Sequence, residues 1–496
     1  MFYTITSTLP EFHGGRTKAL LKRIMFMEAN FDESHIILTT NYNPNYPLVL
    51  ERFKDRKILS HQTKVLNIYE WYTNGENFCF PHSKFRKKKI YNKTPVHING
   101  LTHQSNKKDA NIIRYYKEDQ YVLYRKYYDV NSEILQFEDF MLPSQKHKAE
   151  RREYNEYGYL HRIIMYDKKK NTKLSERLYN QDGQIYCVRH FTNNKVSHIA
   201  LYKNNTIVHT FDNEGDFFTY FYENVIEDDA IVFNDARLLD DAILNVKKSL
   251  KNVFVIHSSH KTIDGNIKGR YRLLYNRAEE IDQIVVLTPH QKEEMMEDFG
   301  ISGTRLTVIP HFSTIYEVQE NDRYPKFLYL GRIDENKQVS HILQAFKRYK
   351  DAGYDYGLNI YGYGDPQDIK NMKNEISNLN LHKHVKFHGK TDEPETIFRQ
   401  HAASILASQF EGFALSVMES VNNGCPVLAY DIRYGPRDLI VEGENGHLVE
   451  SQNIEDLAEK MKRITEYPIT DVKLDGRFST EQAKKNYKAL IEKLVQ

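Results

Sequence analysis

Two glutamates lie on either side of a short apolar run in the stretch SQFEGFALSVMES, residues 408–420. Seven residues separate Glu411 from Glu419, so one carboxylate would lie at the start of a helix and the other two turns along it. The preceding run ASILAS is typical of a buried strand, and Gly424 is a suitable helix end. We therefore expect a strand, a turn over 408–412 and a helix, with the turn at the carboxyl edge of a sheet.

The start of this helix would form an anion site. The backbone N–H groups of Phe413, Ala414 and Leu415 would point out of the helix with a partial positive charge, which suits a diphosphate. Glu411 would lie beside that site and accept hydrogen bonds from sugar hydroxyls, and Glu419 would accept them from a ribose diol. The alternative is a capping carboxylate followed by a solvated helix glutamate, which is the more common origin of an isolated pair at this spacing.

Two cations follow another expected strand in the sequence GRIDENKQ. Arg332 and Lys337 would lie at its carboxyl end, where a forked guanidinium and an ammonium can hold a sugar-nucleotide diphosphate without a metal. The sequence contains no D-x-D triplet, which argues against a manganese-bridged nucleotide. The alternative is a solvated pair of surface charges.

Three weaker signals come from glycine-containing turns and a histidine. Gly15 belongs to FHGGRT (12–17), where two glycines would let the backbone approach a phosphate or a sugar, or would only form a turn. His257 ends a buried strand and would contact a transferred sugar, or it is a satisfied core histidine. Gly362, in YGYGD, and the later YGPRD (434–438) would shape a nucleotide pocket, although each is nonspecific alone.

The composition bounds the class of protein. A chain of 496 residues with 40% hydrophobic and 27% charged residues predicts two or three globular domains. A formal net charge of only +2 gives no global field for nucleic acid. Three scattered cysteines favour a reducing cytosol, and we expect a cytoplasmic protein without a signal peptide or membrane span. Any membrane contact would therefore be peripheral, at the inner face of the membrane.

Strand and helix signals alternate at both ends of the chain. They predict two similar α/β domains that face a cleft and bind a ligand at the carboxyl ends of their strands. The rhythm breaks between about residue 80 and residue 215, where Tyr-rich segments with Asn/Asp-Gly turns predict an antiparallel meander.

The domain boundaries follow from this rhythm. An N-terminal Rossmann-like domain is expected over 1–80 and 211–315, with a β-rich insert over 81–210. A C-terminal Rossmann-like nucleotide-sugar domain is expected over 316–475. A final helix over 476–496 would cross back to the N-terminal domain.

Taken in order, these motifs resemble a known family. The Gly-Gly loop, the strand-end histidine, G-R-x-x-x-x-K and E-G-F-x-L-S-x-x-E together resemble the retaining family 4 glycosyltransferases of the GT-B fold. YDIRYGPRDLI and the β-rich insert are similar to a narrower group, the wall teichoic acid α-glycosyltransferases of the TagE and TarM type. They are also similar to the enzymes that glycosylate serine-rich adhesins.

This resemblance implies roles for individual residues. Arg332 and Lys337 would hold the diphosphate of a UDP-sugar, Glu411 would touch the donor hexose, and Glu419 the uridine ribose. Gly15 would approach donor or acceptor, and His257 would lie near the sugar. Ala414 departs from the family, which commonly has glycine there, but the position is expected to require only a small residue. No metal or other cofactor is implied.

The resemblance also implies substrates and partners. We expect a retaining transfer of α-glucose from UDP-glucose to glycerol-phosphate units of wall teichoic acid, because HGGRTKALLKR looks closer to TagE than to TarM. The alternatives are transfer from UDP-GlcNAc to poly(ribitol phosphate) or to a serine-rich adhesin, and an inactive substrate-binding partner. Basic runs at 83–93 and 167–173 would attract a polyanionic teichoic acid chain or anionic lipid, or form a solvated face. The insert would assemble a homotrimer.

Overall fold

The computed structural model describes residues 1–11, 14–75, 91–142, 147–315 and 323–496. Its contacts divide the chain into two compact units, Met1–Leu250 and Lys251–Gln496. The boundary falls inside the segment 211–315, which the sequence assigns to a single N-terminal domain. The start of the expected insert at residue 81 and the linker residues 316–322 lie outside the described residues.

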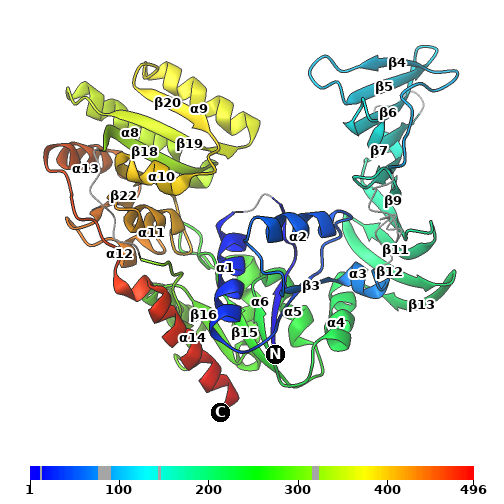
Figure 1. Ribbon diagram of the computed structural model, residues 1–496, viewed down its shortest axis with the longest axis horizontal. Helices are drawn as coiled ribbons and strands as arrows, with labels where there is room; N and C mark the ends of the chain where they lie inside the picture. The colour runs from blue at the N-terminus through cyan, green and yellow to red at the C-terminus, as the bar shows by residue number, and fades with distance from the viewer. Residues whose placement is uncertain (12–13, 76–90, 143–146, 316–322) are drawn as a thin grey trace. The chain divides into compact units, whose positions relative to one another are not determined.

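The first unit begins with alternating strands and helices, as the sequence predicts (Figure 1). The elements before the insert are β1 (Phe2–Thr6), α1 (Gly15–Asn30), β2 (His35–Thr39), α2 (Tyr46–Asp55), β3 (Lys64–Asn67) and α3 (Ile68–Tyr72). The elements after it are α4 (Glu214–Val225), β14 (Ala230–Asn234), η1 (Arg237–Leu239) and α5 (Asp240–Leu244). β14, β1, β2 and β3 pair in this order, all in parallel, so the segments before and after the insert form one sheet.

A buried ion pair connects the two halves of this sheet layer. The two terminal guanidinium nitrogens of Arg23, on α1, donate to Asp235, directly after β14, at 3.0 and 2.6 Å. The two side chains are 4% and 0% exposed. Because a buried charge is costly unless it is paired, this contact fixes α1 against the end of β14.

The insert is an antiparallel meander, which confirms the expectation from its Tyr-rich hairpins. Its described strands are β4 (Thr102–Ser105), β5 (Ile112–Lys117), β6 (Gln120–Asp129), β7 (Ile134–Met141), β8 (Lys148–Tyr154), β9 (Leu160–Tyr166), β10 (Lys173–Tyr179), β11 (Ile185–Thr192), β12 (Lys195–Lys203) and β13 (Thr206–Phe211). They form one ten-stranded sheet in sequence order, with β4 and β13 at its edges (Figure 1). Tyr42 on the parallel-sheet side hydrogen-bonds to His161 on β9 at 2.9 Å, and Arg189 on β11 donates to Tyr69 on α3 at 3.0 Å.

The second unit contains two groups of parallel strands. The first group and its helices are β15 (Leu250–Val255), η2 (Gly269–Tyr271), α6 (Arg272–Asn276), η3 (Ala278–Glu280), β16 (Gln283–Val286), α7 (Pro289–Phe299) and β17 (Leu306–Val308). β16 pairs with β15 on one side and with β17 on the other.

The second group forms a parallel sheet of six described strands, in the order β20-β19-β18-β21-β22-β23. Its elements are β18 (Tyr324–Ile333), η4 (Glu335–Lys337), α8 (Val339–Asp351), β19 (Gly357–Gly364), α9 (Pro366–Asn378), β20 (Val385–Gly389), α10 (Pro394–Arg399), β21 (His401–Leu406), α11 (Leu415–Asn422), β22 (Val427–Tyr430), α12 (Pro436–Leu439), β23 (Gly446–Val449), α13 (Ile454–Glu466), η5 (Gly476–Phe478) and α14 (Thr480–Val495). The sequence reading missed β23.

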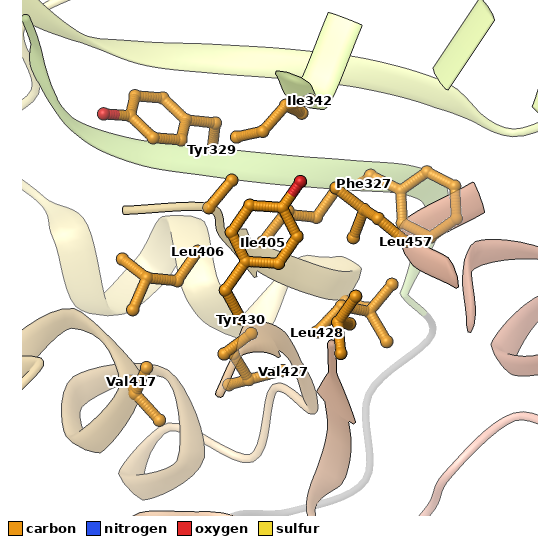
Figure 2. Close-up of a cluster of buried hydrophobic side chains, with 14 of the residues drawn as sticks. Phe327, Tyr329, Ile342, Ile405, Leu406, Val417, Val427, Leu428, Tyr430 and Leu457 are labelled. Carbon is orange, nitrogen blue, oxygen red and sulfur yellow. The ribbon is translucent and has the colours of Figure 1, made fainter. Parts of the chain in front are cut away.

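Short apolar strands give this sheet its core. Phe327 on β18, Ile405 on β21 and Leu428 on β22 lie together among buried side chains from the covering helices (Figure 2). Val417 on α11 and Leu457 on α13 contribute to the same cluster. This packing fixes β18 and β21 as neighbours, and the chemistry-bearing loops follow directly after both strands.

The C-terminal helix α14 begins after a side-chain cap, four residues later than the expected start at 476. Ser479 accepts a hydrogen bond from Gln482 N at 3.1 Å, which satisfies one of the unpaired N–H groups of the first turn. At the other end of the helix, Lys493 Nζ donates to Gln283 Oε1 at 3.1 Å. Tyr487 packs against Phe312 with ring centroids 6.5 Å apart. The helix therefore contacts the β15–β17 segment, which belongs to the same unit.

Candidate functional site

Lys337 and Glu411 come together after two neighbouring strands of the six-stranded sheet. Lys337 ends η4, which follows β18, and Glu411 lies in the loop between β21 and α11. The ammonium donates a hydrogen bond to Glu411 Oε1, and the side chains are only 15% and 17% exposed. Ser408 Oγ donates to the same carboxylate oxygen at 2.8 Å. Such a charge-assisted contact, largely shielded from water, can orient a polar substrate.

The carboxylate of Asp334 connects Arg332 with Lys337 of this pair. Arg332 is the penultimate residue of β18 rather than a residue after the strand, because the pairing with β19 continues through Ile333. Its Nη1 lies 3.1 Å from Asp334 Oδ2, and Asp334 Oδ1 accepts a hydrogen bond from Lys337 N at 3.1 Å. The guanidinium is 55% exposed, so it is accessible to an anionic ligand.

The backbone around Glu411 is held from two sides. Gln409 N donates to Asn336 O at 2.8 Å, which ties the loop to η4. On the other side, Glu411 N donates to Arg433 O at 2.8 Å and Tyr434 N donates to Glu411 O at 2.9 Å. The position of the Glu411 carboxylate therefore depends on two separate segments.

The helix after Glu411 begins later than the sequence indicates. α11 starts at Leu415, because Ala414 takes a left-handed conformation with φ of 63° and acts as the N-cap residue. Glu419 consequently lies about one turn into the helix rather than two. The expected N–H donors shift in the same way, since Phe413 and Ala414 precede the helix.

Ala414 is also a less neutral departure from glycine than expected. The position is buried and requires a positive φ, which glycine adopts readily. An L-residue in this region is disfavoured by roughly 1–2 kcal/mol. The requirement at this position is therefore conformational as well as steric.

His257 is brought to the same turn by its backbone. It follows β15 by two residues, is half-buried, and stacks on His311 with ring centroids 5.9 Å apart. A Cβ at Gly412 would lie 2.1 Å from the carbonyl oxygen of His257. Only glycine permits this approach, so the sequence E-G-F places His257 against the residue next to Glu411.

The two other predicted glycines have different surroundings. Gly15 is the first residue of α1 in the first unit and is exposed, while residues 12 and 13 of the same motif lie outside the described residues. Gly362 lies inside β19, in register with Gly331 of β18, and not in a turn as expected. A Cβ at Gly362 would lie 2.0 Å from Gly331 O, so its small size serves the close approach of the strands.

Comparison with known proteins shows what the segment that contains these loops is similar to. Residues 314–485 match the family model described as "Glycosyl transferases group 1". Residues 314–485 are therefore similar to a group 1 glycosyltransferase domain, and this segment is called the group 1 domain below. All of Arg332, Lys337, Glu411 and Glu419 lie within it.

Curated relatives extend over nearly the whole chain. A poly(glycerol-phosphate) α-glucosyltransferase of Bacillus subtilis is 27% identical over 92% of this chain and 69% of its own length. A poly(ribitol-phosphate) α-N-acetylglucosaminyltransferase of Staphylococcus aureus is 23% identical over 91% of this chain and 90% of its own length. The predicted resemblance to teichoic acid α-glycosyltransferases is confirmed.

A solved structure shows the fold. A crystal structure of a S. aureus TarM mutant with Fondaparinux, α-GlcNAc-glycerol and UDP matches with a TM-score of 0.79 and 22% identity, covering 100% of this chain and 98% of the other. The predicted GT-B-like α/β fold, with an antiparallel insertion in the N-terminal region, is confirmed.

Helix α7, outside the group 1 domain, supports the Glu411 loop through a residue that sequence reasoning missed. Glu294 on α7 accepts a hydrogen bond from Arg433 Nε at 2.7 Å and another from the Tyr434 hydroxyl. Burial would raise the pKa of Glu294, but these two hydrogen bonds and the cations Arg433 and Lys261 lower it to about 2. Glu294 thus holds the two residues whose backbone brackets Glu411. No local pattern marks it, because its partners are far away in the sequence.

The same cluster is not built for a metal ion. His260, Glu294 and Asp298 have ligand atoms within 4.8 Å of one another. However, Lys261 Nζ lies 2.8 Å from Asp298 Oδ2 and 3.5 Å from Glu294 Oε2, and Arg433 occupies Glu294 Oε1. A divalent cation would have to displace two charged side chains, so these three residues form an ion-pair network.

Proposed function

We propose that this chain transfers α-glucose from UDP-glucose to glycerol-phosphate units of wall teichoic acid, with retention of configuration. The observation that supports it most is the contact of Lys337 with Glu411, close to Arg332, inside the group 1 domain. The B. subtilis relative, which acts on poly(glycerol phosphate) according to its name, matches 92% of the chain. A second candidate is N-acetylglucosamine transfer to poly(ribitol phosphate), because the S. aureus relative with that name covers nearly as much.

The donor would be held by the charges of the site. Arg332 and Lys337 bind the diphosphate, Glu411 accepts hydrogen bonds from hexose hydroxyls, and Glu419 accepts them from the ribose. His257 lies near the sugar, because its carbonyl already contacts Gly412. Gly15, the first residue of α1, would approach donor or acceptor.

The transfer step follows from what these groups can do. The bond between the anomeric carbon and the UDP oxygen breaks, and the acceptor oxygen bonds to that carbon on the same face. The acceptor hydroxyl's proton passes to the departing diphosphate oxygen, whose growing charge Arg332 and Lys337 stabilise. Glu411 is paired with Lys337 and Ser408, so it acts as a positioning group for the sugar.

The proposal includes independence of metal ions, since Arg332 and Lys337 would supply the positive charge that a metal would otherwise bring to the diphosphate. Turnover in a chelator such as EDTA is expected to equal turnover with added Mn²⁺ or Mg²⁺. Restoration of a lost activity by either ion would contradict this part of the proposal.

The acceptor would be recognised by its negative charge. In the run 167–173, residues Lys168, Lys169 and Lys170 are exposed in the turn between β9 and β10. Residues 83–90 of the other run lie outside the described residues. A phosphodiester chain drawn to such lysines should bind less well as salt increases.

One assay separates the alternatives. Purified chain is incubated with UDP-glucose or UDP-GlcNAc and with poly(glycerol phosphate), poly(ribitol phosphate) or a Ser-rich peptide, and UDP release and label transfer are measured. We expect the highest turnover with UDP-glucose and poly(glycerol phosphate). The glucose in the product should be linked in the α configuration. A preference for the peptide, or no release with any pair, would contradict the proposal; the second result is expected of an inactive partner.

A further inference from the structure

A short basic loop lies directly beside the turn over 408–412. This turn carries Glu411 and is called the catalytic turn in this subsection. The basic loop is defined here as residues 268–272, KGRYR, spanning η2 and the first residue of α6. Lys268 Nζ lies 3.7 Å from the centroid of the Phe410 ring, and Phe410 immediately precedes Glu411. The ammonium also donates to Ser259 O at 3.1 Å, so its position is fixed. The first residue of the basic loop, Lys268, therefore contacts the neighbour of Glu411, which is the residue proposed to bind the donor sugar.

Tyr271 holds the loop so that its arginines face solvent. The Tyr271 side chain is 2% exposed, and its hydroxyl donates to Ser258 O at 3.1 Å. Arg270 and Arg272, on either side of it, are both exposed. An anchored residue between two exposed cations presents them on a defined surface.

The charges of this loop are not neutralised by the protein. Among the residues that the structure describes, no carboxylate forms an ion pair with Lys268, Arg270 or Arg272. Nearby arginines differ, since Arg277 pairs with Glu280 at 2.6 Å and Arg305 with Glu279 at 2.8 Å. Burial and the neighbouring Arg270 lower the pKa of Lys268 to about 8. An anion between these groups would relieve their mutual repulsion.

We infer that the basic loop binds phosphate groups of the acceptor chain and guides the reacting unit to the catalytic turn. This inference rests on the proposed function and names its acceptor subsite. A forked guanidinium suits a phosphodiester, and two of them one residue apart can contact successive phosphates of a flexible polymer. An anionic lipid headgroup offers the same chemistry, but the contact of Lys268 with Phe410 places the loop at the transfer site, which favours the acceptor.

The test compares two double variants that remove the same charge. Arg270→Gln/Arg272→Gln alters the basic loop, and Lys484→Gln/Lys485→Gln alters two exposed lysines of α14. Each pair changes the formal net charge from +2 to 0. Steady-state transfer is measured with poly(glycerol phosphate) and, separately, with a single glycerol phosphate unit, over a series of salt concentrations.

The basic-loop variant is expected to raise KM for the polymer about tenfold, with kcat and the KM for UDP-glucose unchanged. In a plot of log KM against the logarithm of the salt concentration, the slope for this variant should be smaller than the wild-type slope by about 1.4, because two phosphate contacts are lost. The α14 variant should behave as the wild type, and Arg270→Lys/Arg272→Lys should keep most of the affinity. The KM for the single glycerol phosphate unit should differ less between the basic-loop variant and the α14 variant than the KM for the polymer does.

Three results would overturn the inference. An unchanged polymer KM and salt dependence in the basic-loop variant would remove the subsite while leaving the proposed function intact. Loss of binding to phosphatidylglycerol vesicles with an unchanged polymer KM would assign the loop to lipid instead. Absence of transfer to the polymer by the wild type would overturn the proposed function together with the inference.

Discussion

The ammonium of Lys337 and the carboxylate of Glu411 neutralise each other, and both side chains are more than four-fifths buried. The roles that we propose for them, toward the diphosphate and the hexose, therefore depend on each other before any substrate binds. Removing one leaves its partner without a counter-charge, which generally costs more than removing both. The site should consequently show strong coupling between the two residues.

A double-mutant cycle tests this coupling. We expect Lys337→Met and Glu411→Gln each to retain the fold and to lower turnover about ten- to a hundredfold, because one charge-assisted contact is lost. The free energy of unfolding should fall by about 1–3 kcal/mol in each single variant, and by less than the sum in the double variant. Stopped assays of UDP release and denaturant unfolding measure the two effects.

The exposed pair Arg348–Glu455 serves as the control, with side chains 53% and 68% exposed. Its removal should change stability by less than about 1 kcal/mol and leave turnover intact. Near-normal turnover in either Lys337→Met or Glu411→Gln would contradict the assignment of the site.

At this scale, local spacing predicted part of the site. Arg332 and Lys337 were found because one short motif places them at the carboxyl end of a strand, and Glu411 because a strand, a turn and a helix surround it. Asp334 lies inside the same motif, but its role in connecting Arg332 with Lys337 N needs the folded turn. Glu294 could not be found, because its contact with Tyr434 spans 140 residues.

At the scale of the elements, the close approach of the segment after β15 to the turn over 408–412 depends on a single glycine. Gly412 lies where an added Cβ would be 2.1 Å from His257 O and 2.9 Å from Ser258 N. Both are backbone atoms, so a side chain would force the segment after β15 away from Glu411. The sequence reading took Gly412 only as the last residue of the turn before a helix.

We expect Gly412→Ala to lower the free energy of unfolding by about 1–3 kcal/mol and to reduce turnover more than donor affinity. The reason is that His257 and Glu411 would move apart while the diphosphate cations remain. The matched control is Gly476→Ala, since no atom lies within 4 Å of a Cβ there. Wild-type kinetics in Gly412→Ala would contradict this account of the turn.

Helix α7 acts on the site through Glu294. Glu294→Gln is expected to lower kcat/KM about tenfold, because the Arg433–Tyr434 segment that brackets Glu411 loses its charged anchor. Glu297→Gln, an exposed position on the same helix, should have no such effect. Glu294→Asp should restore part of the activity, which a purely structural defect would not require.

The lowered pKa of Glu294 also gives a pH dependence. Arg433, Tyr434, Lys261 and His290 all face this carboxylate. A depressed carboxyl pKa stabilises the fold above the ordinary value of 4.5, and this contribution is lost as the pH falls toward about 2. The melting temperature should therefore drop less over this interval in Glu294→Gln than in the wild type.

At the scale of the whole molecule, the alternation of strands and helices predicted the α/β units, and hairpin signals predicted the antiparallel insert. Periodicity reports which faces are buried, so it finds elements well and their limits less well. β23, the late start of α11 and the continuation of β19 through Gly364 were missed because neighbouring strands and a left-handed residue decide them. Among the helices of the described residues, none is long and apolar enough to cross a membrane.

The predicted homotrimer belongs to this scale. The ten-stranded sheet has two edges, and on the edge strand β13 the side chains of Ile207 and Val208 are 51% and 43% exposed. Unpaired strand edges with apolar residues commonly mediate assembly. Light scattering of the full chain at micromolar concentration is expected to give three times the mass of one chain. A monomer over a dilution series would contradict the prediction.

The position of the insert also sets an order for biosynthesis. Phe2 pairs with Ile231, so β1 lacks one of its two neighbours until nearly half of the chain has left the ribosome. At 5–20 residues per second this delay is on the order of ten to fifty seconds. Each meander strand, by contrast, meets its partner as soon as the next hairpin is synthesised. The nascent insert can therefore form first and bring the two ends of the parallel sheet together, while β1 still lacks β14 as a neighbour.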